Sequence, residues 1–116
     1  AFFLRMPFQP ARQLVDAGCA VALATDFNPG SSPSGNMHLA MAMSCIQMKL
    51  LPEEALNAAT INGAFAMEVQ QQAGSIAPGK KANLILTKPL PSLAAIPYYF
   101  GSNCIDRVMI NGQWTM

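Results

Sequence analysis

The sequence has very little charge. Only 11% of its 116 residues are Asp, Glu, Lys or Arg, against about 25% in a typical soluble domain. Hydrophobic residues make up 52% of the chain. A free domain with so few charges would have difficulty covering its surface with polar groups, so we expect the chain to be a piece of a larger protein. The length allows one small domain with a hydrophobic core.

Several partner classes are excluded by what is missing. The net charge is +1 and no basic cluster exceeds the pair Lys80 and Lys81, so we expect no nucleic-acid partner. No apolar run approaches the roughly 18–20 residues of a membrane span, so we expect no membrane partner. Residues 1–4 are too short for the apolar core of a signal peptide, and no basic segment precedes them.

Cysteine and histidine are also scarce. Cys19, Cys45 and Cys104 are widely spaced and form no CxxC pair, so a cysteine zinc site is not expected. The simplest interpretation is reduced, buried thiols in a cytoplasmic protein. His38 is the single histidine. It could be a metal ligand or a general base, but a lone histidine near the start of a helix is more often structural.

The most informative stretch joins an apolar run to a polar turn. Residues 21–24 (Val-Ala-Leu-Ala) have the composition of a short buried strand, and Thr25 and Asp26 follow directly. Residues 28–31 (Asn-Pro-Gly-Ser) predict a turn. A carboxylate where a buried parallel strand leaves its sheet is a recurrent catalytic position. The alternative is that Asp26 merely begins an Asx-turn.

The elements around this stretch are predicted from periodicity and stop signals. Residues 1–3 read as the end of a strand, and a helix runs from Pro10 to a stop at Gly18. With the strand at 21–24 this makes a βαβ unit with parallel strands. Asn36 is placed to cap a buried, methionine-rich helix at 38–50.

Further helical segments and a β unit complete the chain. A helix begins at Pro52, breaks at residues 62–63 (Asn-Gly), and is followed by helical residues 64–69. Residues 74–81 nearly match the nucleotide-binding P-loop. However, Lys81 replaces the required Ser or Thr, and a helix precedes the segment where a strand is needed. A turn at residues 78–79 and strand 82–87 are predicted instead, then a hairpin, 106–110 and 113–116, joined by Asn-Gly.

Residues 25–33 (Thr-Asp-Phe-Asn-Pro-Gly-Ser-Ser-Pro) carry a family resemblance. The segment resembles the Asp-x-Asn-Pro-Gly-(Thr/Ser) motif of the imidazolonepropionases, which belong to the metal-dependent amidohydrolase superfamily. Residues 1–5, 74–86 and 98–112 also look like this family, so the resemblance covers most of the chain. Asn83 departs from it, since an Asp that is not a metal ligand is usual there.

The resemblance implies an α/β fold built from part of a larger architecture. Residues 1–78 would be the last strands and helices of a (β/α)8 TIM-like barrel, and residues 79–116 part of a small composite β-sandwich. A complete barrel needs about 200 residues or more, so the chain would be the C-terminal portion of one.

The chemistry implied is hydrolysis of the ring amide of 4-imidazolone-5-propanoate to N-formimidoyl-L-glutamate, a step of histidine degradation. The family uses one divalent metal, zinc or iron, to activate a water. Asp26 matches the metal-binding Asp, which can also take the proton from that water. Asn28, Gly30 and Ser31 match positions that bind the small-molecule substrate.

The rest of the implied site is missing. The family's histidine ligands, including a His-x-His pair, have no counterpart here, and a catalytic zinc needs about three protein ligands. The fragment alone is therefore expected to be inactive, and to associate with the missing barrel segments or with itself through exposed apolar surface. Another cyclic amidohydrolase of the superfamily, or a non-catalytic domain that has kept the motif, are the alternatives.

Overall fold

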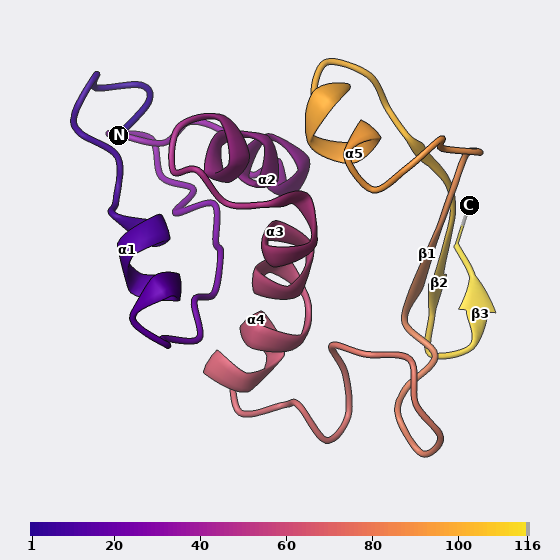
Figure 1. Cartoon of the computed structure of the whole chain (residues 1–116). Helices are drawn as coiled ribbons and strands as arrows, with labels where there is room; N and C mark the ends of the chain where they lie inside the picture. Colours follow the sequence, from indigo (N-terminus) through magenta and orange to yellow (C-terminus); the bar gives the residue numbers. More distant parts are fainter. Residues whose placement is uncertain (116) are drawn as a thin grey trace.

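The computed structural model describes residues 1–115, with four helices followed by a small sheet whose first two strands are separated by a fifth, short helix (Figure 1). None of the helices in this described part is long and apolar enough to cross a membrane. In chain order the elements are α1 (Ala11–Asp16), α2 (Met37–Ile46), α3 (Pro52–Ala59), α4 (Ile61–Ala66), β1 (Leu84–Thr87), α5 (Ala95–Tyr98), β2 (Ile105–Ile110) and β3 (Gln113–Trp114).

The starts of the two longest helices follow from capping. Asn36 caps α2 as predicted, because its Oδ1 accepts hydrogen bonds from the backbone N–H groups of His38 (2.9 Å) and Leu39 (3.3 Å). At α3, Leu51 has no side-chain acceptor, but the Glu54 carboxylate accepts a hydrogen bond from the Leu51 N–H at 2.8 Å. This supplies half of a capping box, and Pro52 occupies the first turn.

The end of α2 and the break between α3 and α4 both differ from the predictions. Helix α2 stops at Ile46 rather than at residue 50, because Lys49 adopts a left-handed backbone (φ +63°). The break between α3 and α4 falls at Thr60, with φ −118° and ψ −89°, and Asn62 and Gly63 lie inside α4. The Thr60 hydroxyl donates to the Leu56 carbonyl at 2.7 Å, a local bond that competes with helix continuation.

The core is built mainly from small side chains. Six of the eight buried hydrophobic residues are alanines, and Ala42, Ala55 and Ala58 are at most 1% exposed. Helices α2 and α3 pack together through such residues, as do α3 and α4. Met41 and Leu50 complete this core, whereas many other large apolar side chains are exposed. Ile46 of α2 is 53% exposed, so the expectation of a fully buried helix was wrong. The cysteines are free, and Cys19 is exposed rather than buried.

The predicted βαβ unit is absent from the described residues. Residues 21–24 form no strand, and residues 1–4 lie in or beside a turn. A strand requires a hydrogen-bonded neighbour, and none is present here. Instead, the Leu23 N–H donates to the Ala58 carbonyl (3.0 Å) and Asn62 Nδ2 donates to the Val21 carbonyl (2.9 Å). These bonds fasten the segment to α3 and α4, so it reaches the turn at Asp26 in a defined position.

The C-terminal sheet has the order β1-β2-β3 and is antiparallel throughout. The Asn-Gly hairpin is confirmed, since Asn111 (φ +51°) and Gly112 (φ +79°) both adopt positive φ as a type I′ turn requires. Strand pairing of the hairpin covers Gln113 and Trp114, and Met116 lies outside the described residues. Asn83 anchors this hairpin, because its Oδ1 accepts a hydrogen bond from the Asn111 N–H at 2.8 Å.

Arg12 and Glu54 join α1 to the start of α3. Two parallel hydrogen bonds connect them, Nη1 to Oε2 at 2.7 Å and Nη2 to Oε1 at 2.9 Å. These bonds and the Leu51 N–H hold the pKa of Glu54 below its usual value. A lowered folded-state pKa means that the stabilisation is present above the unfolded-state pKa of about 4.3 and is lost as the pH falls through the folded-state value.

We therefore expect Arg12→Leu to lower the thermal midpoint at pH 7 and to lower it less at pH 3. The physical reason is that pH 3 lies below the unfolded-state pKa of Glu54, so part of the ionic stabilisation is already lost there and the variant has less of it to lose. Thermal melts of the wild type and the variant at both pH values measure the difference. An equal gap between the two proteins at pH 7 and pH 3 would show that the pair contributes no ionic stabilisation.

Candidate functional site

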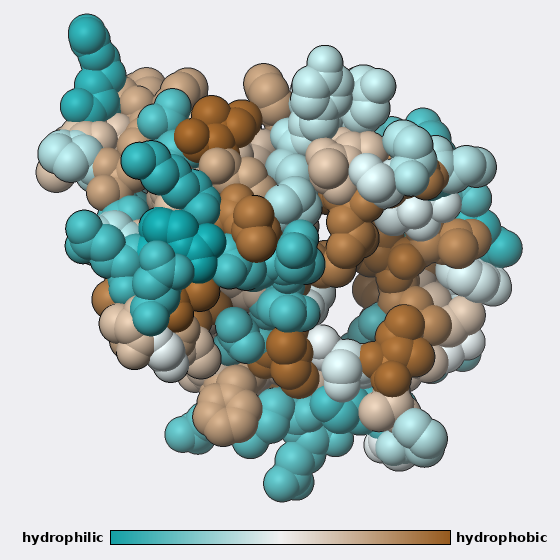
Figure 2. All heavy atoms as spheres, viewed as in Figure 1, coloured by the Kyte–Doolittle hydropathy of each residue, from teal (hydrophilic) through white to brown (hydrophobic). Residues whose placement is uncertain are grey.

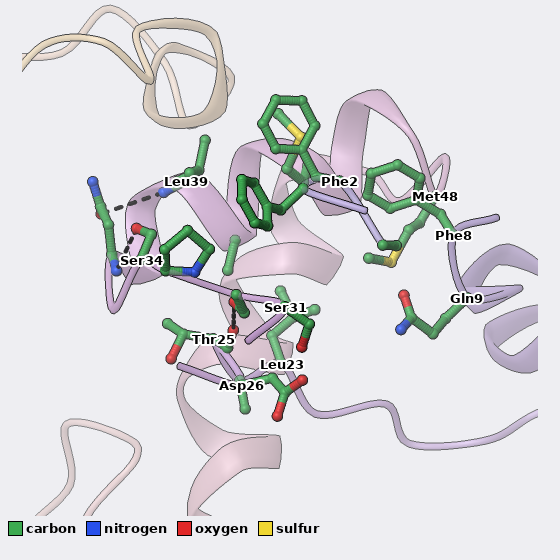
Figure 3. A pocket seen from close by; sticks show the side chains of 18 residues that line it. Phe2, Phe8, Gln9, Leu23, Thr25, Asp26, Ser31, Ser34, Leu39 and Met48 are labelled. Atoms are coloured by element: carbon green, nitrogen blue, oxygen red, sulfur yellow. Dashed lines mark hydrogen bonds between the residues drawn. The ribbon is translucent and has the colours of Figure 1, made fainter. Parts of the chain in front are cut away.

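A cavity of about 270 Å³ lies between the N-terminal segment, the turn after Thr25 and α2. Phe2 and Phe8 form an aromatic wall, Leu23 and Leu39 add apolar surface, and Asp26 and Ser31 lie near one another in the same region (Figure 3). A mostly apolar cavity with a few polar groups at one end is typical of a small-molecule site. The predicted residues Asp26 and Ser31 therefore line one pocket, as a shared role requires.

Asp26 lies where the tethered segment turns. Its backbone is left-handed (φ +52°), a conformation that Asp and Asn tolerate better than most residues. The residue is exposed and lines the cavity. Within residues 1–115 its carboxylate oxygens accept no hydrogen bond, so Asp26 does not cap an Asx-turn. Both oxygens are thus available to a ligand.

Asn28 organises the turn instead. Its Oδ1 accepts from the Gly30 N–H at 3.0 Å, the Ser31 N–H at 2.7 Å and the Ser31 hydroxyl at 3.1 Å. Its Nδ2 donates to the Asp26 carbonyl at 2.7 Å. An amide oxygen with three donors is fully used. Asn28 and Gly30 do not line the cavity in this structure, whereas both were predicted as substrate-binding residues.

A second set of bonds closes the loop, and sequence reasoning missed it. The Ser32 hydroxyl donates to the Thr25 carbonyl at 2.7 Å, and the backbones of Asn28 and Ser32 exchange two hydrogen bonds, at 2.9 and 3.3 Å. The Ser-Ser-Pro-Ser run after Gly30 was the available signal, because serine hydroxyls commonly bond nearby backbone groups. The aromatic wall from Phe2 and Phe8 was missed as well, since neither side chain stands in a motif.

Asn28→Ala is expected to speed amide hydrogen exchange at Gly30 and Ser31 by about fivefold. Losing the shared acceptor costs each N–H a hydrogen bond worth about 1 kcal/mol, which corresponds to roughly that factor. Exchange followed by NMR measures it. Asn28→Asp is the matched control, because it keeps the acceptor oxygen and should retain protection at both amides. Unchanged exchange in Asn28→Ala would remove Asn28 as the organiser of the turn.

A metal at this site would find one ligand among the described residues. Asp26 offers a free carboxylate, an oxygen donor that suits zinc or iron. No group of three or more His, Cys, Asp or Glu side chains that could hold a metal occurs in residues 1–115. Asp26 therefore fits as one ligand of such an ion, and the remaining ligands have to come from elsewhere.

His38 takes no part in this cavity. Its ring Nε2 is hydrogen-bonded to the Ile96 carbonyl of α5, whereas the α2 residues that line the cavity include Leu39 and Ala40 but not His38. The structure thus favours the structural interpretation of His38 over a role as a metal ligand or general base beside Asp26.

The chain is similar to curated proteins and to a solved structure over nearly its whole length. The chain is 60% identical over 113 residues to an imidazolonepropionase of Flavobacterium johnsoniae and 57% identical to one of Christiangramia forsetii, in each case over 97% of this chain. It spans 28% of the length of these curated relatives. An adenosine deaminase structure from Xanthomonas campestris with bound zinc superposes with a TM-score of 0.80 at 26% identity, covering 94% of this chain and 28% of that one.

The family assignment rests on nearly the whole chain. The model of the amidohydrolase family matches residues 4–115, which include the turn at Asp26, α2 and the C-terminal sheet. Relatives and the structural neighbour support an α/β fold for it. The superfamily is metal-dependent, in keeping with the zinc named for the neighbour. The chain is a member of the amidohydrolase family.

Proposed function

We propose that this chain is part of an imidazolonepropionase, which hydrolyses the ring amide of 4-imidazolone-5-propanoate to N-formimidoyl-L-glutamate. The observation that carries the proposal is Asp26, whose free carboxylate lies on a small-molecule cavity beside Ser31. Relatives with 57–60% identity carry the name imidazolonepropionase. Because the chain spans 28% of their length, the residues that complete the site belong to the rest of a longer polypeptide.

Asp26 serves two purposes in this scheme. It would be one ligand of a single divalent metal, zinc or iron, which when bound would supply Lewis-acid activation of the attacking water. One carboxylate oxygen also takes the proton from that water as its oxygen attacks the ring carbonyl. The C–N bond of the ring then breaks, and the proton returns to the leaving nitrogen. A carboxylate can serve in both ways because its second oxygen remains free.

The turn after Asp26 is suited to an anionic group of the substrate. The N–H groups of Gly30 and Ser31 and the Ser31 hydroxyl all point at one position, which the Asn28 Oδ1 occupies. Three donors converging on an oxygen favour a carboxylate oxygen in the same place. The propanoate group of the substrate has such an oxygen, and to reach these donors it would have to displace the side chain of Asn28, which does not line the cavity in this structure.

The exposed apolar surface supports association with other polypeptide. Hydrophobic residues lie along part of the rim of a hollow between the helices and the sheet, beside hydrophilic ones (Figure 2). Both faces of the sheet carry exposed apolar side chains, among them Ile85 (62% exposed) and Leu86 (49%). We assign residues 1–78 to the end of a (β/α)8 barrel, in which residues 21–24 would pair as a strand, and residues 79–116 to a β-sandwich. The remaining barrel segments, or a second copy of the chain, would cover these surfaces in a cytoplasmic enzyme.

The test is an assay of the full polypeptide with 4-imidazolone-5-propanoate. We expect N-formimidoyl-L-glutamate to form when the full polypeptide is present and none to form with the 116 residues alone. The second candidate is a deaminase acting on a cyclic amidine, favoured by the zinc-containing adenosine deaminase neighbour. Release of ammonia from adenine or guanine derivatives, without turnover of the imidazolone, would support that candidate. No turnover of either class would favour the non-catalytic interpretation.

A further inference from the structure

We infer that His38 is a positioning residue, whose Nε2–H binds the Ile96 carbonyl, holds the first turn of α2 against α5 and so fixes one wall of the cavity. Its kinetic consequences rest on the proposed function, whereas its structural consequences do not. Three features carry the inference, namely the hydrogen bond, the weak internal support of α5 and the place of the first turn of α2 in the cavity wall.

The hydrogen bond fixes the state of the imidazole. A carbonyl oxygen can only accept, so the Nε2 of His38 has to carry the hydrogen. The neutral Nε2–H tautomer and the imidazolium both satisfy this requirement. The bond is therefore retained whether or not the ring is protonated, and an engaged Nε2 is unavailable as a metal ligand.

Helix α5 has little support of its own. It contains four residues, has no side-chain N-cap, and a helix this short is not stable in isolation. Its position comes from burying Ala95 and Pro97 and from packing on α2, beside which it lies in Figure 1. The bond from His38 to Ile96 crosses 58 residues of sequence and joins the two helices directly.

The first turn of α2 forms one side of the cavity. Asn36 and Leu39 line it, and the Asn36 side chain caps the N–H groups of His38 and Leu39. Asp26 is held by other hydrogen bonds. Asn28 Nδ2 donates to the Asp26 carbonyl, and the Ser32 hydroxyl donates to the carbonyl of the preceding Thr25. Loosening His38 should hence disturb the wall that contacts the substrate and leave the carboxylate in place.

The kinetic test uses His38→Leu and His38→Gln in the full polypeptide. His38→Leu should raise the KM for 4-imidazolone-5-propanoate roughly two- to tenfold, the range expected for one lost hydrogen bond, with kcat within about twofold of the wild type. His38→Gln places an amide donor near the Nε2 position and should restore KM. Gln47→Leu, an exposed residue at the other end of α2, is the control for a polar-to-leucine change and should alter neither constant.

Two outcomes would overturn the inference. A fall in kcat of about 100-fold or more in both His38 variants would indicate a direct role in proton transfer or metal binding. An unchanged KM in His38→Leu would show that the bond does not fix the wall.

A readout without activity separates this inference from the proposed function. Imidazole 15N NMR should show the Nε2–H tautomer, and in His38→Leu the amides of Tyr98 and Tyr99, which bond to the Ala94 and Ala95 carbonyls, should exchange about fivefold faster. An Nδ1–H tautomer or unchanged exchange would contradict the inference even in an active enzyme. If these signals appear in a protein that does not hydrolyse the imidazolone, the proposed function fails and the positioning of α5 stands.

Discussion

Asp26→Asn should lower the kcat of the full polypeptide for 4-imidazolone-5-propanoate by about 10³-fold or more without unfolding it. Asn cannot accept the proton from water and is a poor metal ligand, and loss of a general base alone typically costs about 10²–10⁴-fold. The fold should survive because Asn tolerates the left-handed backbone of this position (φ +52°). The hydrogen bond on the Asp26 carbonyl is also unaffected, since it involves the backbone. Steady-state kinetics and circular dichroism of the variant measure both parts.

Glu68→Gln is the matched control for Asp26→Asn. Glu68 is an exposed acidic residue with nearly the same backbone (φ +61°), and it lies outside the cavity. Its amide variant should keep wild-type kcat. Activity within about tenfold of the wild type for Asp26→Asn would remove Asp26 from the chemistry, whereas equal losses in both variants would point to a general effect of lost charge.

Gly74→Ala should destabilise the protein by about 2–5 kcal/mol. A Cβ built on Gly74 would lie 2.6 Å from the Ala64 Cβ and 3.1 Å from the Ile61 Cα, so part of α4 would have to move. Overpacking of this kind costs about 1–3 kcal/mol, and the left-handed backbone (φ +92°) adds about 1–2 kcal/mol for a residue with a side chain. Urea unfolding of matched variants measures the loss.

Gly79→Ala separates these two costs. Gly79 has a similar backbone (φ +88°), but a Cβ there would meet nothing within 4 Å. The control should therefore lose only the backbone part, about 1–2 kcal/mol. Equal losses for the two variants would contradict the close packing of residue 74 on α4.

Local signals predicted the features that short segments decide. The Asn-Gly hairpin, the turn at residues 78–79 and the Asn36 cap all formed, because each depends on φ angles or hydrogen bonds within a few residues. The strand at 21–24 failed for the opposite reason. Pairing depends on a neighbour that lies far away in sequence or outside the chain, and composition carries no information about whether that neighbour is present.

The candidate site was also predictable only in part. Asp26 was identified from its place after an apolar run, Ser31 from the family resemblance, and both line one cavity in the structure. The use of Asn28 was not predictable. The side-chain amide of an Asn in a turn can form the same hydrogen bonds with a ligand or with the neighbouring backbone. In the structure, the Asn28 Oδ1 accepts from the N–H groups of Gly30 and Ser31.

Anomalous diffraction from crystals of the full polypeptide, at the zinc and iron absorption edges, tests the central claim most directly. The account predicts one metal peak within bonding distance, about 2.0–2.2 Å, of an Asp26 carboxylate oxygen, with the other ligands outside these 116 residues. A fully occupied metal site elsewhere, with no metal within bonding distance of the Asp26 carboxylate, would contradict the account.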